Sequence, residues 1–213
     1  MNDSVLIIDF GSQVTQLIAR RLREAGVYTE ILPCTADSAR ITAAAPRGII
    51  LSGGPNSVAM ADTPRVPQEV FHLDVPVLGI CYGQQTMCQQ LGGRVEPGTS
   101  REFGRATLAI GESCALFEGL WPVGETRTVW MSHGDHVAQL PPGFRVVATS
   151  PGAPFAAVSD DERRYYGVQF HPEVVHTEEG GALLSRFALG VCGCSGNWSM
   201  TAYRARAIEA IYA

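Results

Sequence analysis

The sequence predicts an α/β fold with a central, mostly parallel sheet, helices on both faces and an antiparallel flank. In the first 90 residues, apolar runs alternate with amphipathic or turn-rich segments, an order typical of parallel βαβ units. From Arg94 onward the apolar runs are short and separated by turn residues, as in antiparallel strands. A chain of 213 residues can bury one full core without disulfides.

The first expected βαβ unit occupies residues 5–32. Residues 5–9 form an apolar run, and Ser12 can cap the helix that follows. Gly26 ends this helix before a second strand over residues 27–32, and a parallel, right-handed connection is expected. The helix places an apolar set on one face: Val14, Leu17, Ile18, Leu22 and Ala25.

Two further strands complete the expected parallel part. Residues 49–51 form a strand that ends in Ser52-Gly53-Gly54-Pro55. Residues 75–80 form the next strand, which ends at Cys81, and a helix is expected to begin near Gln84.

The second half of the chain supplies the expected antiparallel flank, then one more apolar strand and a helix. The flanking strands are predicted over residues 106–110, 127–131, 145–149 and 155–158. The later strand is predicted over residues 165–170 and the helix over residues 180–189. In the tail, an apolar stripe at helical spacing suggests either a partner or packing on the chain's own core: Met200, Tyr203, Ala207, Ile208 and Ile211.

Composition excludes several classes of function. The net charge is −5 and no basic run occurs, which argues against nucleic acid as a partner. All 16 basic residues are arginines, so a catalytic lysine is excluded. The N-terminus does not resemble a signal peptide, and no run approaches the roughly 18 apolar residues of a membrane span. No membrane association is therefore expected.

The six cysteines are scattered, and we interpret them as reduced thiols of a cytoplasmic protein. Cys192 and Cys194 form a lone C-x-C pair without a second pair of ligands, so a zinc site is not expected.

Cys81 is the strongest candidate for a nucleophile. It lies at the predicted strand-to-helix turn between Gly79 and Gly83, where small neighbours permit a strained conformation. A position at a helix N-terminus also stabilises the thiolate. The alternative is a buried structural cysteine.

His171 and Glu173 can complete a catalytic triad with this cysteine. His171 is expected at the end of a strand, on the sheet edge where α/β active sites lie. In extended backbone, residues i and i+2 project to the same side, so Glu173 can orient the imidazole. Pro172 between them fixes φ.

Gly53 and Gly54 can supply backbone N–H groups at the end of a neighbouring strand. Together with the N–H of Tyr82, they could form an oxyanion hole. The alternative is a simple turn.

These residues resemble a known family. Residues 79–85, GICYGQQ, are similar to the G-x-C-x-G-x-Q elbow of class I glutamine amidotransferases, and His171-Pro172-Glu173 resembles the family's second signature. Residues 9–13, 101–104 and 131–135 resemble one branch of the family, the glutaminase domains of GMP synthetases. The resemblance covers essentially the whole chain and implies the family's flavodoxin-like fold.

The resemblance implies roles for individual residues. Cys81 would be the nucleophile, His171 the base and Glu173 its orienter, and the N–H groups of Gly54 and Tyr82 would bind the oxyanion. By the same resemblance L-glutamine is the substrate, and Asp135 also resembles a residue of a loop that faces the partner domain. His133 is a rival base that the family does not use in its triad. The implied glutamine-binding residues are Gly53, Gln85, Ser132, His133, Gly134 and Asp135.

Relatives of this kind continue into an ATP-pyrophosphatase domain and a dimerisation domain, and neither occurs in these 213 residues. We expect residues 1–190 to form the amidotransferase domain and residues 191–213 a connector and the start of a helix leading to the synthetase domain. ATP and Mg²⁺ would belong to that domain, so this chain is expected to need no cofactor and no metal.

The implied activity is hydrolysis of glutamine through a γ-glutamyl thioester, with ammonia passing to an adenylated xanthosine monophosphate on the synthetase domain. Three alternatives stay open. They are an amidotransferase serving another acceptor such as chorismate, a non-catalytic homologue, and a cysteine peptidase on a related fold.

Overall fold

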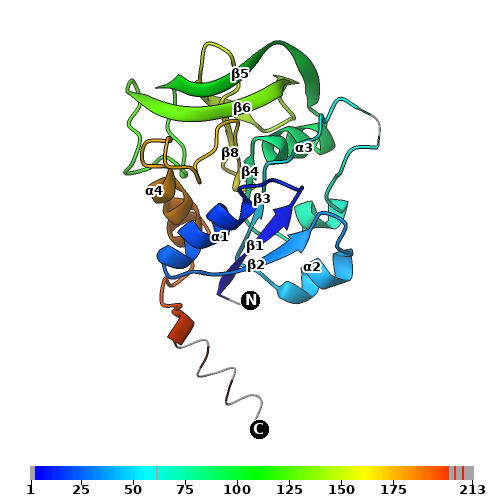
Figure 1. Cartoon of the computed structure of the whole chain (residues 1–213), viewed down its shortest axis with the longest axis vertical. Coiled ribbons are helices and arrows are strands. Elements are labelled where there is room, and N and C mark those ends of the chain that lie inside the picture. The colour runs from blue at the N-terminus through cyan, green and yellow to red at the C-terminus, as the bar shows by residue number, and fades with distance from the viewer. Residues whose placement is uncertain (1–2, 61, 202–203, 205–207, 209–213) are drawn as a thin grey trace.

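Nine strands form one sheet in the computed structural model, in the order β2-β1-β3-β4-β9-β8-β7-β5-β6 (Figure 1). The structure describes residues 3–60, 62–201, 204 and 208, and of residues 99–101 only the backbone. The first five strands in this order run parallel to one another, and the others pair antiparallel. The predicted fold class is therefore confirmed.

The parallel half follows the predicted βαβ order. Its strands and helices, in chain order, are β1 (Ser4–Asp9), α1 (Thr15–Glu24), β2 (Tyr28–Pro33), α2 (Ser38–Ala44), β3 (Gly48–Leu51), η1 (Gln68–His72), β4 (Val77–Ile80), α3 (Tyr82–Gln90) and β9 (Tyr165–Val168). The helix α2 was not expected. Its start is explained by Asp37, whose carboxylate accepts a hydrogen bond from the Arg40 N–H at 2.7 Å.

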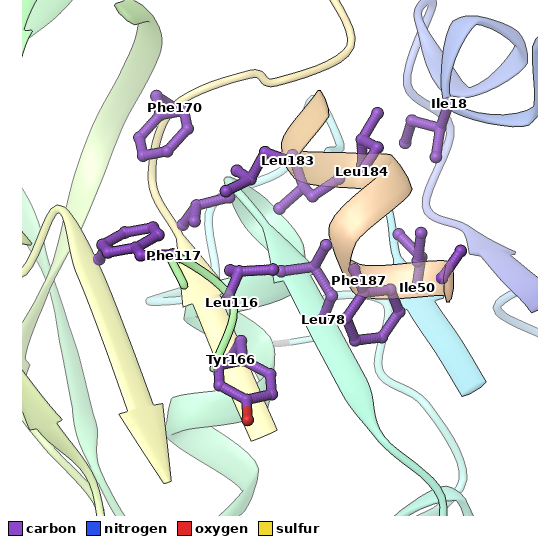
Figure 2. Packing of buried hydrophobic residues seen from close by; sticks show 14 of the residues in the cluster. Ile18, Ile50, Leu78, Leu116, Phe117, Tyr166, Phe170, Leu183, Leu184 and Phe187 are labelled. Carbon is purple, nitrogen blue, oxygen red and sulfur yellow. The ribbon is translucent and has the colours of Figure 1, made fainter. Parts of the chain in front are cut away.

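Helices cover both faces of the parallel strands. Val5 and Ile7 of β1 face a core formed with α1 and with α4 (Gly180–Ser185), whereas Leu6 and Ile8 face a second core formed with α2 and α3. Figure 2 shows α4 and the following π-helical turn η2 (Arg186–Val191) placing Leu183, Leu184 and Phe187 over β3 and β4.

The antiparallel half departs from the prediction in strand length. Strands β5 (Arg94–Ile110) and β6 (Thr126–Gln139) pair as a long ribbon. Strand β7 (Arg145–Thr149) pairs with β5, and β8 (Ala157–Asp160) pairs with β7. The predicted strands 106–110 and 127–131 are only parts of this ribbon. Cross-strand pairing carries both strands well beyond the predicted segments, with an irregularity between Pro97 and Glu102.

Several predicted boundaries were wrong by a few residues. The strand predicted over 75–80 begins at Val77, the strand predicted over 165–170 ends at Val168, and the helix predicted over 180–189 becomes π-helical at Arg186. Ser12 does not cap α1 as predicted, because the N-cap is Val14, whose N–H donates to Ser12 Oγ at 3.2 Å.

The connector after η2 packs back onto the domain. The Cys194 N–H donates to the Ala188 carbonyl at 3.0 Å, and the Trp198 N–H donates to the Gly26 carbonyl at 2.8 Å. Of the predicted apolar stripe, Met200 and Ile208 are exposed, while Tyr203, Ala207 and Ile211 lie outside the described residues. In the part of the chain that the structure describes, no helix is long and apolar enough to cross a membrane.

Candidate active site

Cys81 lies between β4 and α3 in a conformation that few side chains adopt. Its φ is 52° and its ψ is −108°, and the helix begins immediately after it, at Tyr82 and not near Gln84 as predicted. A Cβ on Gly79 would lie 2.6 Å from the Gln84 nitrogen, and one on Gly83 would lie 2.1 Å from the Leu51 carbonyl oxygen. The tight turn therefore requires both glycines, as the sequence predicted.

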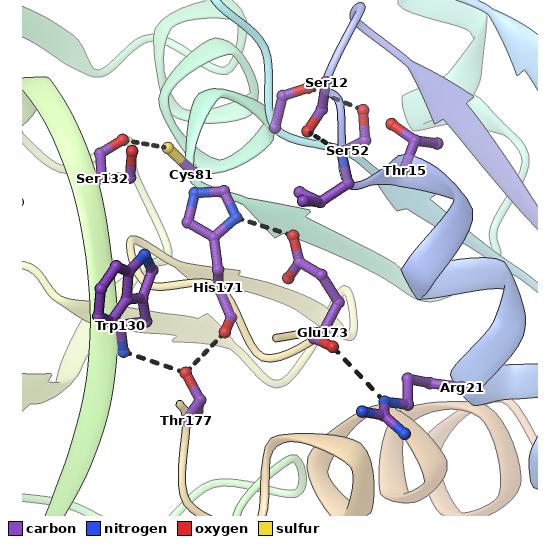
Figure 3. Close-up of polar contacts among 12 residues, drawn as sticks. Ser12, Thr15, Arg21, Ser52, Cys81, Trp130, Ser132, His171, Glu173 and Thr177 are labelled. Carbon is purple, nitrogen blue, oxygen red and sulfur yellow. Dashed lines mark hydrogen bonds and ion pairs between the residues drawn. The ribbon is translucent and has the colours of Figure 1, made fainter. Parts of the chain in front are cut away.

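His171 lies between Cys81 and Glu173 (Figure 3). Its Nδ1 is 2.8 Å from Glu173 Oε1, and the Cys81 side chain is near enough to raise the pKa of the imidazole. The sequence argument for this contact was wrong in one respect, because Pro172 and Glu173 form a turn and not extended backbone. The carboxylate nevertheless reaches the imidazole.

Thr177, which was not predicted from the sequence, links the backbone of His171 to Trp130 of β6. The Thr177 hydroxyl donates to the His171 carbonyl at 2.6 Å and accepts from the Trp130 N–H at 3.0 Å. The His171 N–H in turn donates to the Trp130 carbonyl at 2.9 Å. No motif in the sequence marked Thr177, because its role depends on the position of β6 in space.

The electrostatic environment makes His171 a strong base. Burial lowers its pKa, but hydrogen bonds with Cys81 and Glu173 and the charge of Glu173 outweigh burial and raise the pKa to about 10. Glu173 is fully buried, and its Oε2 has no hydrogen-bond partner among the described residues. The uncompensated charge of this carboxylate acts chiefly on the imidazole beside it.

The predicted oxyanion donors lie beside the cysteine. Gly54 and Tyr82 line a cavity of about 390 Å³ together with Cys81. In the part of the chain that the structure describes, neither the Gly54 N–H nor the Tyr82 N–H donates to another backbone group. Ser52 Oγ donates to the Gly53 carbonyl at 2.8 Å, which fixes the orientation of the peptide that carries the Gly54 N–H.

The predicted glutamine-binding residues line the same cavity, except Gly53. Gln85 donates both amide hydrogens within the protein, to the Asp135 carbonyl at 2.8 Å and to Gln169 Oε1 at 3.0 Å, so its own carbonyl oxygen is left for a ligand. Asp135 Oδ2 is buried without a hydrogen-bond partner among the described residues. Gly53 instead approaches the imidazole, since a Cβ there would lie 3.1 Å from His171 Cε1.

The ring nitrogens of His133 are directed at residues other than Cys81. Its Nδ1 is 3.0 Å from the Asp135 carbonyl oxygen and its Nε2 is 3.2 Å from Glu102 Oε2. Burial lowers the pKa of His133 and outweighs its hydrogen bonds with Asp135 and Glu102. Both ring nitrogens are thus engaged on β5 and β6, which supports His171 over His133 as the base.

Two other cysteines are poor candidates for a nucleophile. Burial raises the pKa of the Cys88 thiol to about 12 and that of Cys194 to about 11. Within the described ranges, no group of three or more His, Cys, Asp or Glu side chains is placed to hold a metal ion.

Comparison with known proteins agrees with this geometry. The family model of Glutamine amidotransferase class-I matches residues 6–191. A GMP synthase [glutamine-hydrolyzing] from Rhizobium rhizogenes is 60% identical over 209 residues, which are 98% of this chain and 40% of that protein. The chain thus spans about 40% of the length of the curated relative it matches.

One solved structure supports the same family, and a second shares the fold. A protein from Thermoplasma acidophilum, described as a GMP synthase subunit, superposes with a TM-score of 0.76 at 31% identity, covering 89% of this chain and 94% of that one. A glutamine amido transferase from Methylobacillus flagellatus shares the fold, with a TM-score of 0.68 at 19% identity over 91% of this chain and 94% of that one. The chain belongs to the class-I glutamine amidotransferase family.

Proposed function

We propose that this chain hydrolyses L-glutamine to glutamate and ammonia through a γ-glutamyl thioester on Cys81. The observation that carries the proposal is the placement of His171 between Cys81 and the buried carboxylate of Glu173, at the edge of a cavity lined by glutamine-compatible groups. A cysteine, a base and an orienting carboxylate in hydrogen-bonding sequence are the parts that nucleophilic catalysis requires.

The first half of the reaction forms the thioester. The Cys81 thiol lies 3.6 Å from the Ser132 carbonyl oxygen and transfers its proton to His171, whose raised pKa favours the transfer. The thiolate attacks the amide carbon of glutamine, and the resulting oxyanion accepts hydrogen bonds from the Gly54 and Tyr82 N–H groups. The imidazolium then gives its proton to the departing nitrogen, so ammonia leaves and the thioester remains.

The amino-acid end of glutamine is recognised on the opposite side of the cavity. The buried, unpartnered Oδ2 of Asp135 is suited to accept the α-ammonium group, and the Gln85 carbonyl oxygen offers a second acceptor. Support comes from the lining of the first cavity, to which Gln85, Asp135 and Cys81 all contribute. This supports free glutamine over an internal segment of a peptide, in which the α-nitrogens are uncharged amides.

The acceptor of the ammonia is proposed from the relatives. We propose that residues 1–190 are the glutaminase domain and residues 191–213 the link to a synthetase domain or subunit that aminates xanthosine monophosphate to GMP. That partner would bind ATP and Mg²⁺, and no resident cofactor is proposed for this chain. The support is the 60% identity to a GMP synthase [glutamine-hydrolyzing] that is longer than this chain.

Labelling of the cysteine tests the assignment. A glutamine analogue with an electrophilic side chain should alkylate Cys81 and spare Cys88, because the Cys88 thiol is fully buried and its pKa is raised to about 12. Cys81→Ala should abolish glutamate release, and Cys88→Ala is the matched control that should retain it. Peptide mapping that finds the label on Cys88, or a Cys81→Ala variant that still hydrolyses glutamine, would refute the proposal.

A further inference from the structure

A second cavity meets the first one at Cys81. It has a volume of about 380 Å³ and is bounded by residues 11–14 of the β1–α1 turn, by Trp130 and by Val174. Cys81, Gly54, Pro55 and Ser132 line both cavities. The sulfur is therefore reached from two sides, although Cys81 is only 5% exposed.

The two cavities differ in the groups that they contain. Tyr82, Gln85 and residues 133–135 line only the first cavity, whereas His171 lines only the second. The groups suited to an amino acid and the group suited to proton transfer thus line different cavities, which meet at Cys81. Figure 3 shows His171 below Cys81, with Trp130 on one side and Ser12 on the β1–α1 side.

We propose that the second cavity is the chamber in which ammonia leaves the acyl-enzyme and the hydrolytic water enters it. The proposal rests on the glutaminase function proposed above, and it assigns a role to residues 11–13, part of the sequence motif whose purpose the triad does not explain.

Proton transfer by His171 explains why water and ammonia would share the second cavity. After ammonia leaves, His171 is neutral, and the glutamyl chain fills the first cavity. Water must therefore approach the thioester from the other side, where the imidazole can accept its proton. The water oxygen bonds to the carbonyl carbon, the carbon–sulfur bond breaks, and the Cys81 thiolate is restored beside a protonated His171. The same imidazole that protonated the nitrogen thus deprotonates the water, so both small molecules occupy one place.

The motif at residues 9–13 also holds the wall between the cavities. The Phe10 N–H donates to Ser52 Oγ at 3.1 Å, and Ser52 Oγ donates to the Gly53 carbonyl. Asp9 Oδ1 accepts from the Gly11 N–H at 2.9 Å and from the Thr15 hydroxyl at 2.7 Å. The turn that shapes the chamber is therefore tied to the glycine peptide proposed to bind the oxyanion.

Competition between nucleophiles tests the chamber. With hydroxylamine present, the thioester partitions between glutamate and γ-glutamyl hydroxamate, and the product ratio reports access to the acyl carbon. Gln13→Trp narrows the second cavity from an exposed position, and Val174→Trp narrows it from the opposite wall. Asn56→Trp is the matched control, because Asn56 is exposed and lines only the first cavity.

Both second-cavity variants should lower the hydroxamate-to-glutamate ratio by about tenfold, because hydroxylamine has one more heavy atom than water and meets the added steric overlap. The glutamyl-enzyme should accumulate in intact-mass spectra. The electrophilic glutamine analogue should label Cys81 half-maximally at a concentration within about twofold of that for the wild type. Asn56→Trp should raise that concentration and leave the ratio unchanged.

Two results would overturn the proposal: an unchanged ratio in both second-cavity variants, or a shift in Asn56→Trp as large as theirs. Failure of the proposed function is recognised separately, because the wild-type chain would then form no hydroxamate and take no label on Cys81.

Discussion

At the scale of single residues, the triad separates a group that exchanges protons from a group that orients it. His171 carries protons in both half-reactions, whereas Glu173 forms and breaks no bond. His171→Ala should therefore approach the loss caused by Cys81→Ala, and Glu173→Ala should be milder. Steady-state rates of glutamate release measure the difference, and a His171→Ala variant near wild type would show that another histidine is the base.

The interactions of His171 with Cys81 and with Glu173 raise its pKa and give the protein a pH-dependent stability. The folded-state pKa of His171 is about 10, above its ordinary value of 6.5, so the stability gained from its protonation is fully present below pH 6.5 and is lost as the pH rises toward 10. Glu173→Gln removes the buried charge and should shrink this loss. The free energy of unfolding in urea at pH 6 and at pH 9 measures this loss of stability. His72→Gln is the control because His72 is exposed. A loss between these pH values as large in Glu173→Gln as in wild type would contradict the proposed cause.

Asp135 is predicted to act in binding and not in chemistry. Asp135 lines the first cavity, and its unpartnered Oδ2 is proposed to hold the α-ammonium group, an interaction that is the same in the ground state and the transition state. Asp135→Asn should raise KM for glutamine by about 10-fold or more, the effect of losing a charge-assisted hydrogen bond, with kcat little changed. A fall in kcat at constant KM would place Asp135 in the chemical step instead.

At the scale of elements, the β5–β6 ribbon positions the glutamine-binding segment. Glu102 of β5 pairs in register with His133 of β6, and the Glu102 carboxylate reaches the ring that holds the Asp135 carbonyl. Both ring nitrogens of His133 lie within hydrogen-bonding distance of oxygen atoms, so the ring links the Glu102 carboxylate to the Asp135 carbonyl.

Glu102→Ala should therefore leave the buried Nε2 of His133 without a partner. We expect the free energy of unfolding to fall by about 1–3 kcal/mol and KM for glutamine to rise, because the segment loses its anchor. Glu102→Gln should retain most of the stability and most of the affinity for glutamine, since the Gln amide can donate a hydrogen bond to a neutral imidazole. Glu96→Ala, on the same strand but more exposed, is the control for urea unfolding and kinetics. Equal effects of the Ala and Gln variants would contradict this account.

The elements also show what the sequence could predict. Local signals located β1, β3, β7 and the cysteine turn, because apolar runs and flanking glycines act within a few residues. The length of β5 and β6 and the support of His171 by Thr177 depend on pairing between distant segments. Such contacts have no local pattern. The second cavity was missed for the same reason, since its walls come from the β1–α1 turn, β6 and the segment after β9.

At the scale of the whole molecule, the glycine peptide proposed to bind the oxyanion is a site at which a partner could control the reaction. The Gly54 N–H is oriented by the bond from Ser52 Oγ to the Gly53 carbonyl, and Ser52 is tied in turn to Phe10. One such hydrogen bond contributes only about 0.5–1.5 kcal/mol, so modest contacts could reorient the peptide. A misplaced oxyanion donor costs about 10²–10³ in kcat.

Uncoupled hydrolysis would waste glutamine, and this chain spans only about 40% of the length of its curated relative. We therefore predict that the chain alone is a slow glutaminase. Adding the synthetase domain of such a relative with ATP and xanthosine monophosphate should raise glutamate release by about 10-fold or more, chiefly in kcat, because an oxyanion donor acts in the transition state. The partner without its substrates is the control. If the isolated chain works at full speed and the loaded partner changes nothing, then the Gly53–Gly54 peptide is already in its catalytic orientation and Ser52 serves only to hold it there.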